Sequence, residues 1–305
     1  MSFAKSVVVR LMLDISSPPG TRWVPGVAPE RGGFSPARPA AADVQDVYDQ
    51  HRVLQKGYDY VHCNRHVYER TMSMRFIIHD DFWQLFPDAR IGVVIARELD
   101  NRQTERADIA ALLADAATIA AAGLGDDIAA HSAITPWRRA YQTFGVKPSK
   151  YRSSIESLLR SARAQRIRSV NPLVDLYNTV SLTHLLPCGG EDLAAVRGDI
   201  RLELASGGEH FVPLGAQATE PPQLGEVIYR DDAGVICRCW NWREADRTKL
   251  TSSTTDAFLC IEALPPSDEP QLRAACAALA GLAHTHLGAN TTVELLSRTR
   301  PAIAF

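Results

Sequence analysis

The sequence predicts an α+β protein in which the helices precede most of the strands. Between residues 107 and 186 the apolar positions recur at helical spacing, whereas after Gly190 short alternating or apolar runs, separated by turn residues, indicate strands. Helices and strands do not alternate strictly along the sequence, which favours the α+β class over a doubly wound parallel sheet. The 46 % of hydrophobic residues is typical of a globular protein with a substantial core.

The length of 305 residues fits one large domain or two small ones. The stretch 18–39 is rich in Pro, Gly and Arg and has no periodicity, which is typical of loop or disorder. An ordered pattern begins only after Met74, at Arg75-Phe-Ile-Ile-His79. We therefore expect residues 1–73 to be a poorly structured N-terminal extension and residues 74–305 to be the folded domain.

Four helices are predicted in the first half of that domain. Pro136 sets the start of one of them, because proline is favoured in the first helical turn. Ser153 and Glu156 have the spacing of a capping box and open the next. Pro187 ends the last one. The predicted spans are 107–122, 128–144 with its main start near Thr135, a helix that follows residue 153, and 171–186.

The second half is predicted to consist mostly of strands. Gly207-Gly208 indicates a turn, and residues 231–234 are the turn of a hairpin. Pro265-Pro266 breaks the chain before a helix at about 269–286. The predicted strands, with one early strand included, are 91–95, 200–204, 209–214, 226–229, 235–240, 257–263 and 292–296.

Several classes of protein are disfavoured. No apolar run approaches the roughly 18 residues of a membrane helix, and Arg10 interrupts the apolar N-terminal patch, so a signal peptide is not expected. The six cysteines lack the spacing of a disulfide framework, which indicates a cytoplasmic protein with reduced thiols. His62, Cys63 and His66 have metal-like spacing but are too few for structural zinc. Nucleotide-binding glycine motifs are absent, and we expect no metal or cofactor.

A basic cluster lies between residues 135 and 170, where nine Arg or Lys accompany the single acid Glu156. Such a cluster suits a polyanion such as tRNA, because phosphate contacts supply most of the sequence-independent affinity. The alternative is a solvated helix face. The residues predicted to contact tRNA are Arg138, Arg139, Lys147, Lys150 and Arg152.

The helix predicted at 171–186 carries a polar stripe on an otherwise apolar surface. Asn171, Asp175 and Asn178 recur on it at steps of three and four. A mostly apolar helix is buried, so its polar groups need partners or a ligand. Asn171 before Pro172 is a good helix cap, and Asp175 suits the positive end of the helix. Asn178 has neither role and is the first candidate for a site residue.

Two further stretches are candidates for the same site. Gly189-Gly190 lets the backbone approach a ligand closely, and its amides suit an oxyanion or a terminal ribose. The alternative is an ordinary turn after the helix. Trp240-Asn-Trp-Arg243 mixes rings with polar groups that suit the unpaired bases of a tRNA end. The alternative is that these rings fill the core.

The pattern Asn171…Val174-Asp175…Asn178…Pro187…Gly190…Asp192 resembles the segment Asn-x-x-Val-Asp-x-x-Asn to Pro-x-x-Ala-x-Asp of the phenylalanyl-tRNA synthetase beta subunit. That segment belongs to its tRNA-editing (B-three/B-four) domain. Further stretches in the same order resemble free-standing bacterial relatives of this domain. These stretches are Phe82 to Pro87, Lys147-Pro148, Ser153 to Leu158 and Trp240 to Arg243. The resemblance covers about residues 74 to 300.

The resemblance implies an α+β fold of mixed and antiparallel sheets packed with helices, and a pocket in which a mischarged tRNA end is hydrolysed. The synthetase domain has a histidine where this chain has Gly189, and a strand glutamate to which Glu262 is the nearest equivalent. The predicted catalytic residues are Asn178, Gly189, Gly190, Ser181 and Thr255. The predicted substrate-binding residues are Asp175, Pro187, Trp240, Asn241, Arg243 and Glu262.

Three functions remain open from the sequence. The first is a trans-acting aminoacyl-tRNA deacylase, for which a positioned water and an oxyanion pocket are sufficient because the ester is activated. The second is a non-catalytic module of the same fold that binds tRNA or an amino acid, which the glycine at position 189 favours. The third is a small-metabolite enzyme without tRNA affinity. The expected partner is the aminoacylated tRNA end, and neither DNA nor a membrane is expected.

Overall fold

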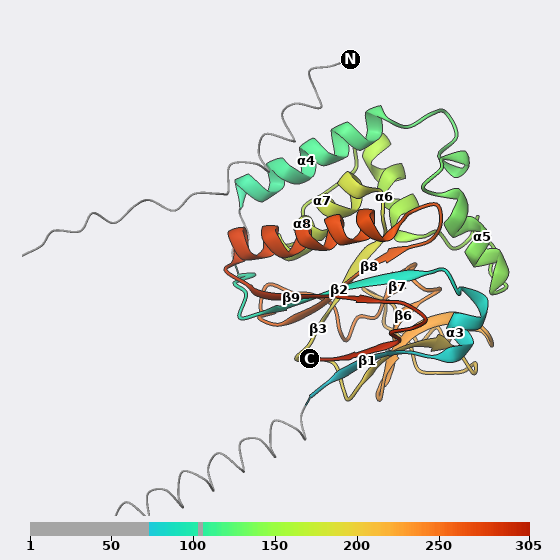
Figure 1. Ribbon diagram of the computed structural model, residues 1–305. Coiled ribbons are helices and arrows are strands. Elements are labelled where there is room, and N and C mark those ends of the chain that lie inside the picture. Colours follow the sequence, from blue (N-terminus) through green and yellow to red (C-terminus); the bar gives the residue numbers. More distant parts are fainter. Residues whose placement is uncertain (1–72, 103–105) are drawn as a thin grey trace, which may run out of the picture. The chain divides into compact units, whose positions relative to one another are not determined.

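Most of the helices lie on one side of the described chain and two β-sheets on the other, so the predicted α+β class is confirmed (Figure 1). The computed structural model describes residues 73–102 and 106–305. The expected N-terminal extension and its histidine–cysteine spacing therefore fall, apart from residue 73, outside the described residues. The elements are β1 (Arg75–Ile78), α3 (Asp80–Leu85), β2 (Arg90–Arg97), α4 (Ala107–Ala122), a 3-10 turn (Ile128–Ala130), α5 (Thr135–Thr143), α6 (Ser154–Arg163), α7 (Pro172–His184), β3 (Cys188–Asp192), β4 (Ile200–Leu204), β5 (Val227–Asp231), β6 (Gly234–Arg238), β7 (Arg243–Glu244), β8 (Ala257–Ala263), α8 (Glu269–Leu287), β9 (Asn290–Leu296) and β10 (Ala302–Ala304).

The strands form one four-stranded and one six-stranded sheet. The four-stranded sheet has the order β3-β8-β2-β9 and is antiparallel throughout. The six-stranded sheet has the order β10-β1-β4-β5-β6-β7, in which β1 and β4 are parallel and the other pairs antiparallel. Rings from the two sheets touch, since Phe76 and Phe258 lie 5.1 Å apart between centroids. Each sheet therefore buries one face against the other.

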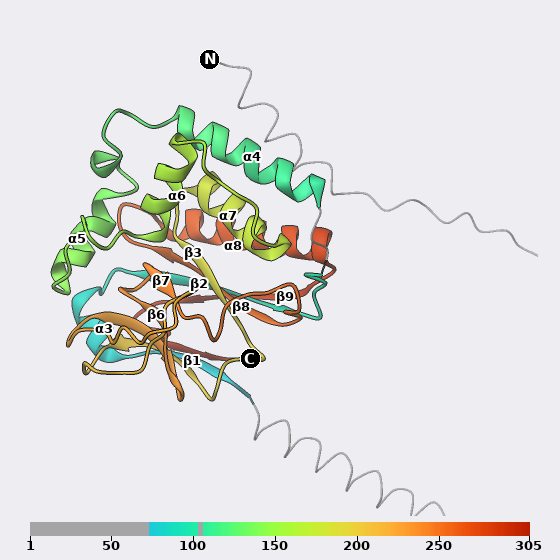
Figure 2. The ribbon, with the colours of Figure 1, turned by 180° about the vertical axis from the view of Figure 1, so that it is seen from behind.

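The four-stranded sheet separates two cores, and strand β2 shows how. Ile91, Val93 and Ile95 face the six-stranded sheet, whereas Val94 and Ala96 face the helices. A strand buried on both faces reads as a continuous apolar run, as was predicted for 91–95. Helices α4, α6, α7 and α8 lie on the far side of this sheet from β1 in both views (Figures 1 and 2).

Helix starts follow the capping residues. The Asn171 side chain accepts from the backbone N–H of Val174 at 3.1 Å and begins α7, and Ser153 accepts from Glu156 at 3.4 Å and begins α6. Helix α5 begins at Thr135 with proline in its first turn, as expected. Among the described helices, none is both long and apolar enough to span a bilayer.

Two stretches differ from the sequence-based expectation. Residues 209–214 do not form a strand but a loop with one isolated bridge at Pro213, because proline cannot donate to a ladder. Residues 188–192, for which a turn was one alternative, form strand β3 at the edge of the four-stranded sheet. Glycine is required there because a Cβ on Gly190 would lie 2.5 Å from Leu259 Cδ2 and 3.0 Å from the carbonyl oxygen of Phe258.

Candidate active site between the two sheets

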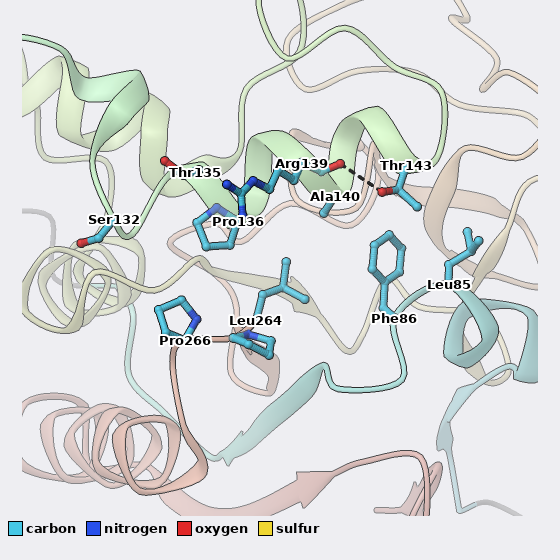
Figure 3. A pocket seen from close by; sticks show the side chains of 11 residues that line it. Leu85, Phe86, Ser132, Thr135, Pro136, Arg139, Ala140, Thr143, Leu264 and Pro266 are labelled. Atoms are coloured by element: carbon cyan, nitrogen blue, oxygen red, sulfur yellow. Dashed lines mark hydrogen bonds between the residues drawn. The ribbon is translucent and has the colours of Figure 1, made fainter.

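Two cavities were compared as candidates for the functional site. The larger, of about 510 Å³, is a groove between α3, α5 and the segment after β8 (Figure 3). It is lined by apolar side chains, a few hydroxyls and one charged side chain, Arg139, whose guanidinium extends toward Pro136. The smaller, of about 40 Å³, lies between the two sheets and is lined by three carboxyl groups. Catalysis needs convergent polar groups, so the smaller cavity, hereafter the inter-sheet cavity, is the candidate site.

The inter-sheet cavity is built from alternate positions of facing strands. Phe258, Cys260 and Glu262 are two residues apart on β8 and so share the face that lines the cavity. Strands β5, β6 and β7 of the other sheet contribute Tyr229, Cys237 and Glu244. The complete lining is Ser154, Cys188, Gly189, Gly190, Glu191, Tyr229, Cys237, Trp240, Asn241, Glu244, Phe258, Cys260 and Glu262.

Glu262 is fixed at one end of the cavity by two donors. Its Oε1 accepts from the Tyr229 hydroxyl at 2.7 Å, and its Oε2 accepts from Asn241 Nδ2 at 2.6 Å. The side chain is 1 % exposed. Burial raises the pKa of Glu262 to about 7, although the bonds from Tyr229 and Asn241 favour the ionised form. A carboxyl group with a pKa near neutrality can exchange a proton at physiological pH.

Asn241 is oriented by a second layer of contacts. Its Oδ1 accepts from the Tyr141 hydroxyl at 3.0 Å and from the backbone N–H of Ser154 at 3.4 Å. These two donors identify Oδ1 as the acceptor side of the amide, so Nδ2 is directed to Glu262. Helices α5 and α6 therefore position the proton-exchanging group of β8 through a single asparagine.

Glu191 and Glu244 form the other end of the cavity. Glu191 is 5 % exposed, and burial raises its pKa well above the usual range, with Glu244 acting in the same direction. Burial raises the pKa of Glu244 to about 7, and its Oε1 accepts from the backbone N–H of Gly190 at 3.4 Å. The two ends stand apart along β8, because Glu191 pairs with Phe258 whereas Glu262 bonds to Pro187.

The two glycines of β3 differ in what their amides face. The backbone N–H of Glu262 donates to the carbonyl of Pro187 in the β3–β8 ladder at 3.1 Å. Hydrogen-bonded positions alternate in an antiparallel ladder, so Gly189 stands at such a position and Gly190 does not. The N–H of Gly190 therefore points away from β8, toward Glu244. Both amides were expected to be open to a ligand. By this geometry only the amide of Gly190 is, because that of Gly189 belongs to the ladder.

Five of the predicted site residues line the inter-sheet cavity: Gly189, Gly190, Trp240, Asn241 and Glu262. The role predicted for Trp240 was wrong, because its ring is 0 % exposed and packs among the rings of Phe82, Phe86 and Trp137. A buried ring cannot stack on a tRNA base, so core packing is the alternative that the structure supports. Only the indole N–H of Trp240 faces the site, directed toward Glu262.

The other predicted catalytic residues lie outside the cavity. Ser181 is buried and donates to the carbonyl of Leu186 at 2.6 Å, and Thr255 is exposed and bonds to Asp256 at 3.0 Å. Asn178 is half-buried on α7, and its side chain makes no hydrogen bond to another described residue. None of these three side chains lines either cavity.

The remaining predicted substrate-binding residues have structural contacts. Asp175 accepts from the Ser169 hydroxyl and from the backbone N–H of Val170 at 2.9 Å, which closes the turn before α7. Pro187 contributes only its carbonyl to the ladder. Arg243 is exposed and donates to the carbonyl of Leu214 at 2.9 Å. Two residues of the polar stripe on α7, Asn171 and Asp175, therefore organise the backbone around the helix start and do not line the cavity.

Part of the basic cluster is neutralised within the protein. Glu156, 1 % exposed, lies 2.9 Å from both Arg138 and Arg160 and 3.9 Å from Arg152. By contrast, Arg139 and Lys147 are exposed and make no ion pair with another described residue. Lys150 lies over the ring of Tyr151 at 4.9 Å. The free positive charge of this surface is therefore smaller than the sequence count.

The sequence analysis missed Glu191, Glu244, Tyr229 and Ser154. Tyr229 and Ser154 stand in elements that were predicted, whereas β3 and β7, which carry Glu191 and Glu244, were not. A strand glutamate also looks the same in sequence whether it faces water or a cavity. The one available signal was the short spacing of Glu191 from Gly189-Gly190. Within residues 73–102 and 106–305, no group of three or more His, Cys, Asp or Glu side chains is arranged to hold a metal ion.

Comparison with known proteins finds a known domain family in the part of the chain that contains this cavity. Residues 136–278 match the family model of the B3/4 domain, a span that contains every residue lining the inter-sheet cavity. One similar solved structure is an N-terminal fragment of the phenylalanyl-tRNA synthetase beta-subunit from Pyrococcus horikoshii, with 12 % identity and a TM-score of 0.38. The match covers 71 % of this chain and 49 % of that one, about half its length. A search of curated proteins found no match. The chain therefore carries a B3/4-like domain.

Proposed function

We propose that the protein hydrolyses the ester bond of aminoacylated tRNA, acting in trans on tRNA that another enzyme has mischarged. The observation that carries this proposal is the inter-sheet cavity itself, which lies wholly within the segment matching the B3/4 domain and contains a carboxyl group with a pKa of about 7. The basic surface of α5 and α6 supports a polyanionic substrate.

In this mechanism Glu262 is the general base. Because its pKa lies near the working pH, the carboxyl group is ionised part of the time, and the carboxylate is basic enough to take a proton from water. Tyr229 and Asn241 hold this carboxylate in one orientation. Glu262 takes a proton as a water oxygen bonds to the acyl carbon. When the bond from that carbon to the ribose oxygen breaks, the same proton passes to the leaving oxygen. The products are the free amino acid and the intact tRNA end.

The backbone N–H of Gly190 is the group proposed to polarise the ester carbonyl. It points out of the β3–β8 ladder and donates only a long bond of 3.4 Å to Glu244. A weak existing bond can be exchanged for one to an oxyanion, which accepts more strongly as charge develops. This assignment replaces Asn178, Ser181 and Thr255 as catalytic residues, because those side chains lie outside the cavity.

The test is a panel of correctly and wrongly charged tRNAs, with ester release measured for wild type and Glu262→Gln. We expect release from at least one mischarged tRNA and a loss of about a hundredfold or more in the variant. Glu209→Gln is the matched control, since Glu209 lies outside both cavities. Release by the Glu262→Gln variant at the wild-type rate would remove Glu262 from the mechanism, and no release from any tRNA would remove the enzymatic function.

A non-catalytic tRNA-binding module is the second candidate. Both oxygens of Glu262 already have donors, and a glycine stands at position 189 where the synthetase domain has histidine. This function predicts binding of uncharged tRNA with steep salt dependence and no ester release. The same panel, combined with a filter-binding titration, distinguishes the two.

A further inference from the structure

The inter-sheet cavity has more carboxyl groups than the proposed hydrolysis uses. Glu191 and Glu244 line it together with Glu262, and its lining contains no Lys, Arg or His. Glu262 has a donor on each oxygen. Glu191 makes no ion pair with a described residue, and Glu244 accepts only the 3.4 Å bond from Gly190. One end of the cavity is therefore an acidic pair without a positive partner among its lining residues.

Unsatisfied buried groups at the cavity point to a ligand. Among the described residues, Oε2 of Glu191 is buried and makes no close hydrogen bond, although the hydroxyl of Thr248, which also lacks one, lies beside this carboxyl group; the hydroxyl of Ser154 is buried without a partner as well. The indole N–H of Trp240, a residue that is 0 % exposed, is directed toward Glu262 but makes no close hydrogen bond with it. Leaving such groups unpaired is costly, and most buried polar groups in proteins have partners. The clustering of three of them around one cavity indicates a molecule that both donates and accepts.

The positions of these groups define the polarity of that molecule. The unsatisfied acceptor, Glu191, lies at the Glu244 end, whereas the unsatisfied donors, Ser154 and Trp240, belong to the end that holds Asn241 and Glu262. Arg247, the cation whose charge acts on Glu191, is already bonded to Asp231 and to the carbonyl of Ala195, both at 2.7 Å. A ligand with a cationic donor at one end and neutral acceptor oxygens at the other would satisfy both ends.

We infer that Glu191 and Glu244 bind a primary ammonium group, which, in the proposed deacylation, is the free α-ammonium of the aminoacyl ester. The identity of the ligand rests on the proposed function, whereas the acidic lining of the site does not. An ammonium donates three hydrogen bonds from a compact centre and relieves the repulsion between two carboxylates.

The ester oxygens would then accept hydrogen bonds from the Ser154 hydroxyl, the indole N–H of Trp240 and the amide of Gly190. Recognition of the ammonium would restrict the site to aminoacyl groups with a free amino end. Esters whose amino group is acylated, such as peptidyl or formylated ones, carry no charge there. Their binding would bury Glu191 and Glu244 without a positively charged partner, which is unfavourable.

The experiment measures binding by calorimetry at pH 7.5 with two non-hydrolysable probes. One is 3′-(L-alanylamino)-3′-deoxyadenosine, and the other is its N-acetyl derivative. For the wild type we expect the N-acetyl probe to bind at least about tenfold more weakly, the effect of losing one hydrogen bond to a charged group. In Glu191→Gln and Glu244→Gln the affinity for the free amine should fall about tenfold, and the preference over the N-acetyl probe should disappear.

Glu209→Gln is the control variant, with wild-type affinities expected. The comparison of probes on the wild type tests the inference even where a variant does not fold. Equal affinity for the two probes, or binding of neither, overturns the inference. Ester release without preference for a free amino group overturns it too while leaving the hydrolytic function intact. Selective binding of the free amine without any ester release supports the ammonium site and removes the hydrolytic function.

Discussion

Glu262 connects the two sheets through a single carboxyl group. Its hydrogen bonds come from Tyr229 on the six-stranded sheet and from Asn241 in the turn after β6. The pKa of about 7 follows from burial, which disfavours charge more than these donors favour it. Such a group affects stability as well as chemistry, because the folded and unfolded states bind protons differently.

The first prediction concerns stability against pH. Because folding raises the pKa of Glu262 from 4.5 to about 7, the native state holds the proton over a range in which the unfolded state has lost it. The free energy of unfolding should therefore fall as pH rises from about 4.5 to 7, and the Glu262 contribution should level off above that. Glu244 acts in the same direction. Glu262→Gln should reduce this slope, as measured by urea denaturation across the range.

Glu209→Gln serves as the control for that titration and should keep the wild-type slope. An unchanged slope in Glu262→Gln would contradict the perturbed titration of this carboxyl. Since glutamine still accepts from Asn241 and can donate to the Tyr229 oxygen, the variant should fold.

The second prediction compares neighbouring glycines. A Cβ at Gly190 would lie 2.5 Å from Leu259 Cδ2, so Gly190→Ala should cost about 1–3 kcal/mol of stability through overpacking. At Gly189 the nearest atom is Glu244 Oε1, at 3.3 Å, the end of a side chain that can move. Gly189→Ala should therefore fold with little loss yet weaken ligand binding. Equal melting temperatures for the two variants would show that β3 adapts more than this packing allows.

At the scale of elements, α5 and α6 form the surface expected to meet tRNA. Glu156 neutralises arginines from both sides, since Arg138 belongs to α5 and Arg160 to α6. This shared carboxylate ties the helices together and lowers the charge available to phosphate. Of the five residues predicted to contact tRNA, Arg139 and Lys147 are exposed, without an ion pair to a described residue and without a contact to a ring, so binding should depend most on these two.

The third prediction follows from that distinction. The double variant Arg139→Gln, Lys147→Gln should weaken tRNA binding similarly for all sequences and reduce the slope of log affinity against log salt by about 2. Arg273→Gln is the matched control, because Arg273 is equally exposed on α8 but paired with Glu269 at 2.8 Å. A filter-binding titration at several salt concentrations measures both. A slope that does not change would place the tRNA contact elsewhere.

At the scale of the whole molecule, the site exists only where the two sheets meet. Tyr229 on one sheet donates to Glu262 on the other and favours its ionised form. The fourth prediction is that Tyr229→Phe raises the pKa of Glu262 further, so the midpoint of the pH–rate profile for ester release moves above about 7. Tyr151→Phe, which removes a hydroxyl outside the cavity, should leave the profile unchanged. A downward movement in Tyr229→Phe would mean that the hydroxyl stabilises the protonated acid instead.

Much of the fold was predictable because its signals are local. Asn171 before Pro172 and Ser153 before Glu156 mark helix starts within a few residues, and the apolar run 91–95 marks a central strand. Strand β3 was harder, because Gly189-Gly190 is as compatible with a turn as with a strand. It is a strand because β8 pairs with it and Leu259 leaves no room for a side chain at Gly190.

The sequence by itself determined the α+β class, the starts of the longer helices, and five of the residues that line the cavity. These follow from local periodicity, capping chemistry and ordered motifs, each of which acts over a few neighbouring residues. Only the tertiary structure decided that Gly190 meets Glu244, 54 positions away, and that Asn178 stands outside the site. The facing of a strand residue depends on which strand pairs beside it, and burial, which sets the pKa of Glu244 and Glu262, depends on how the two sheets pack.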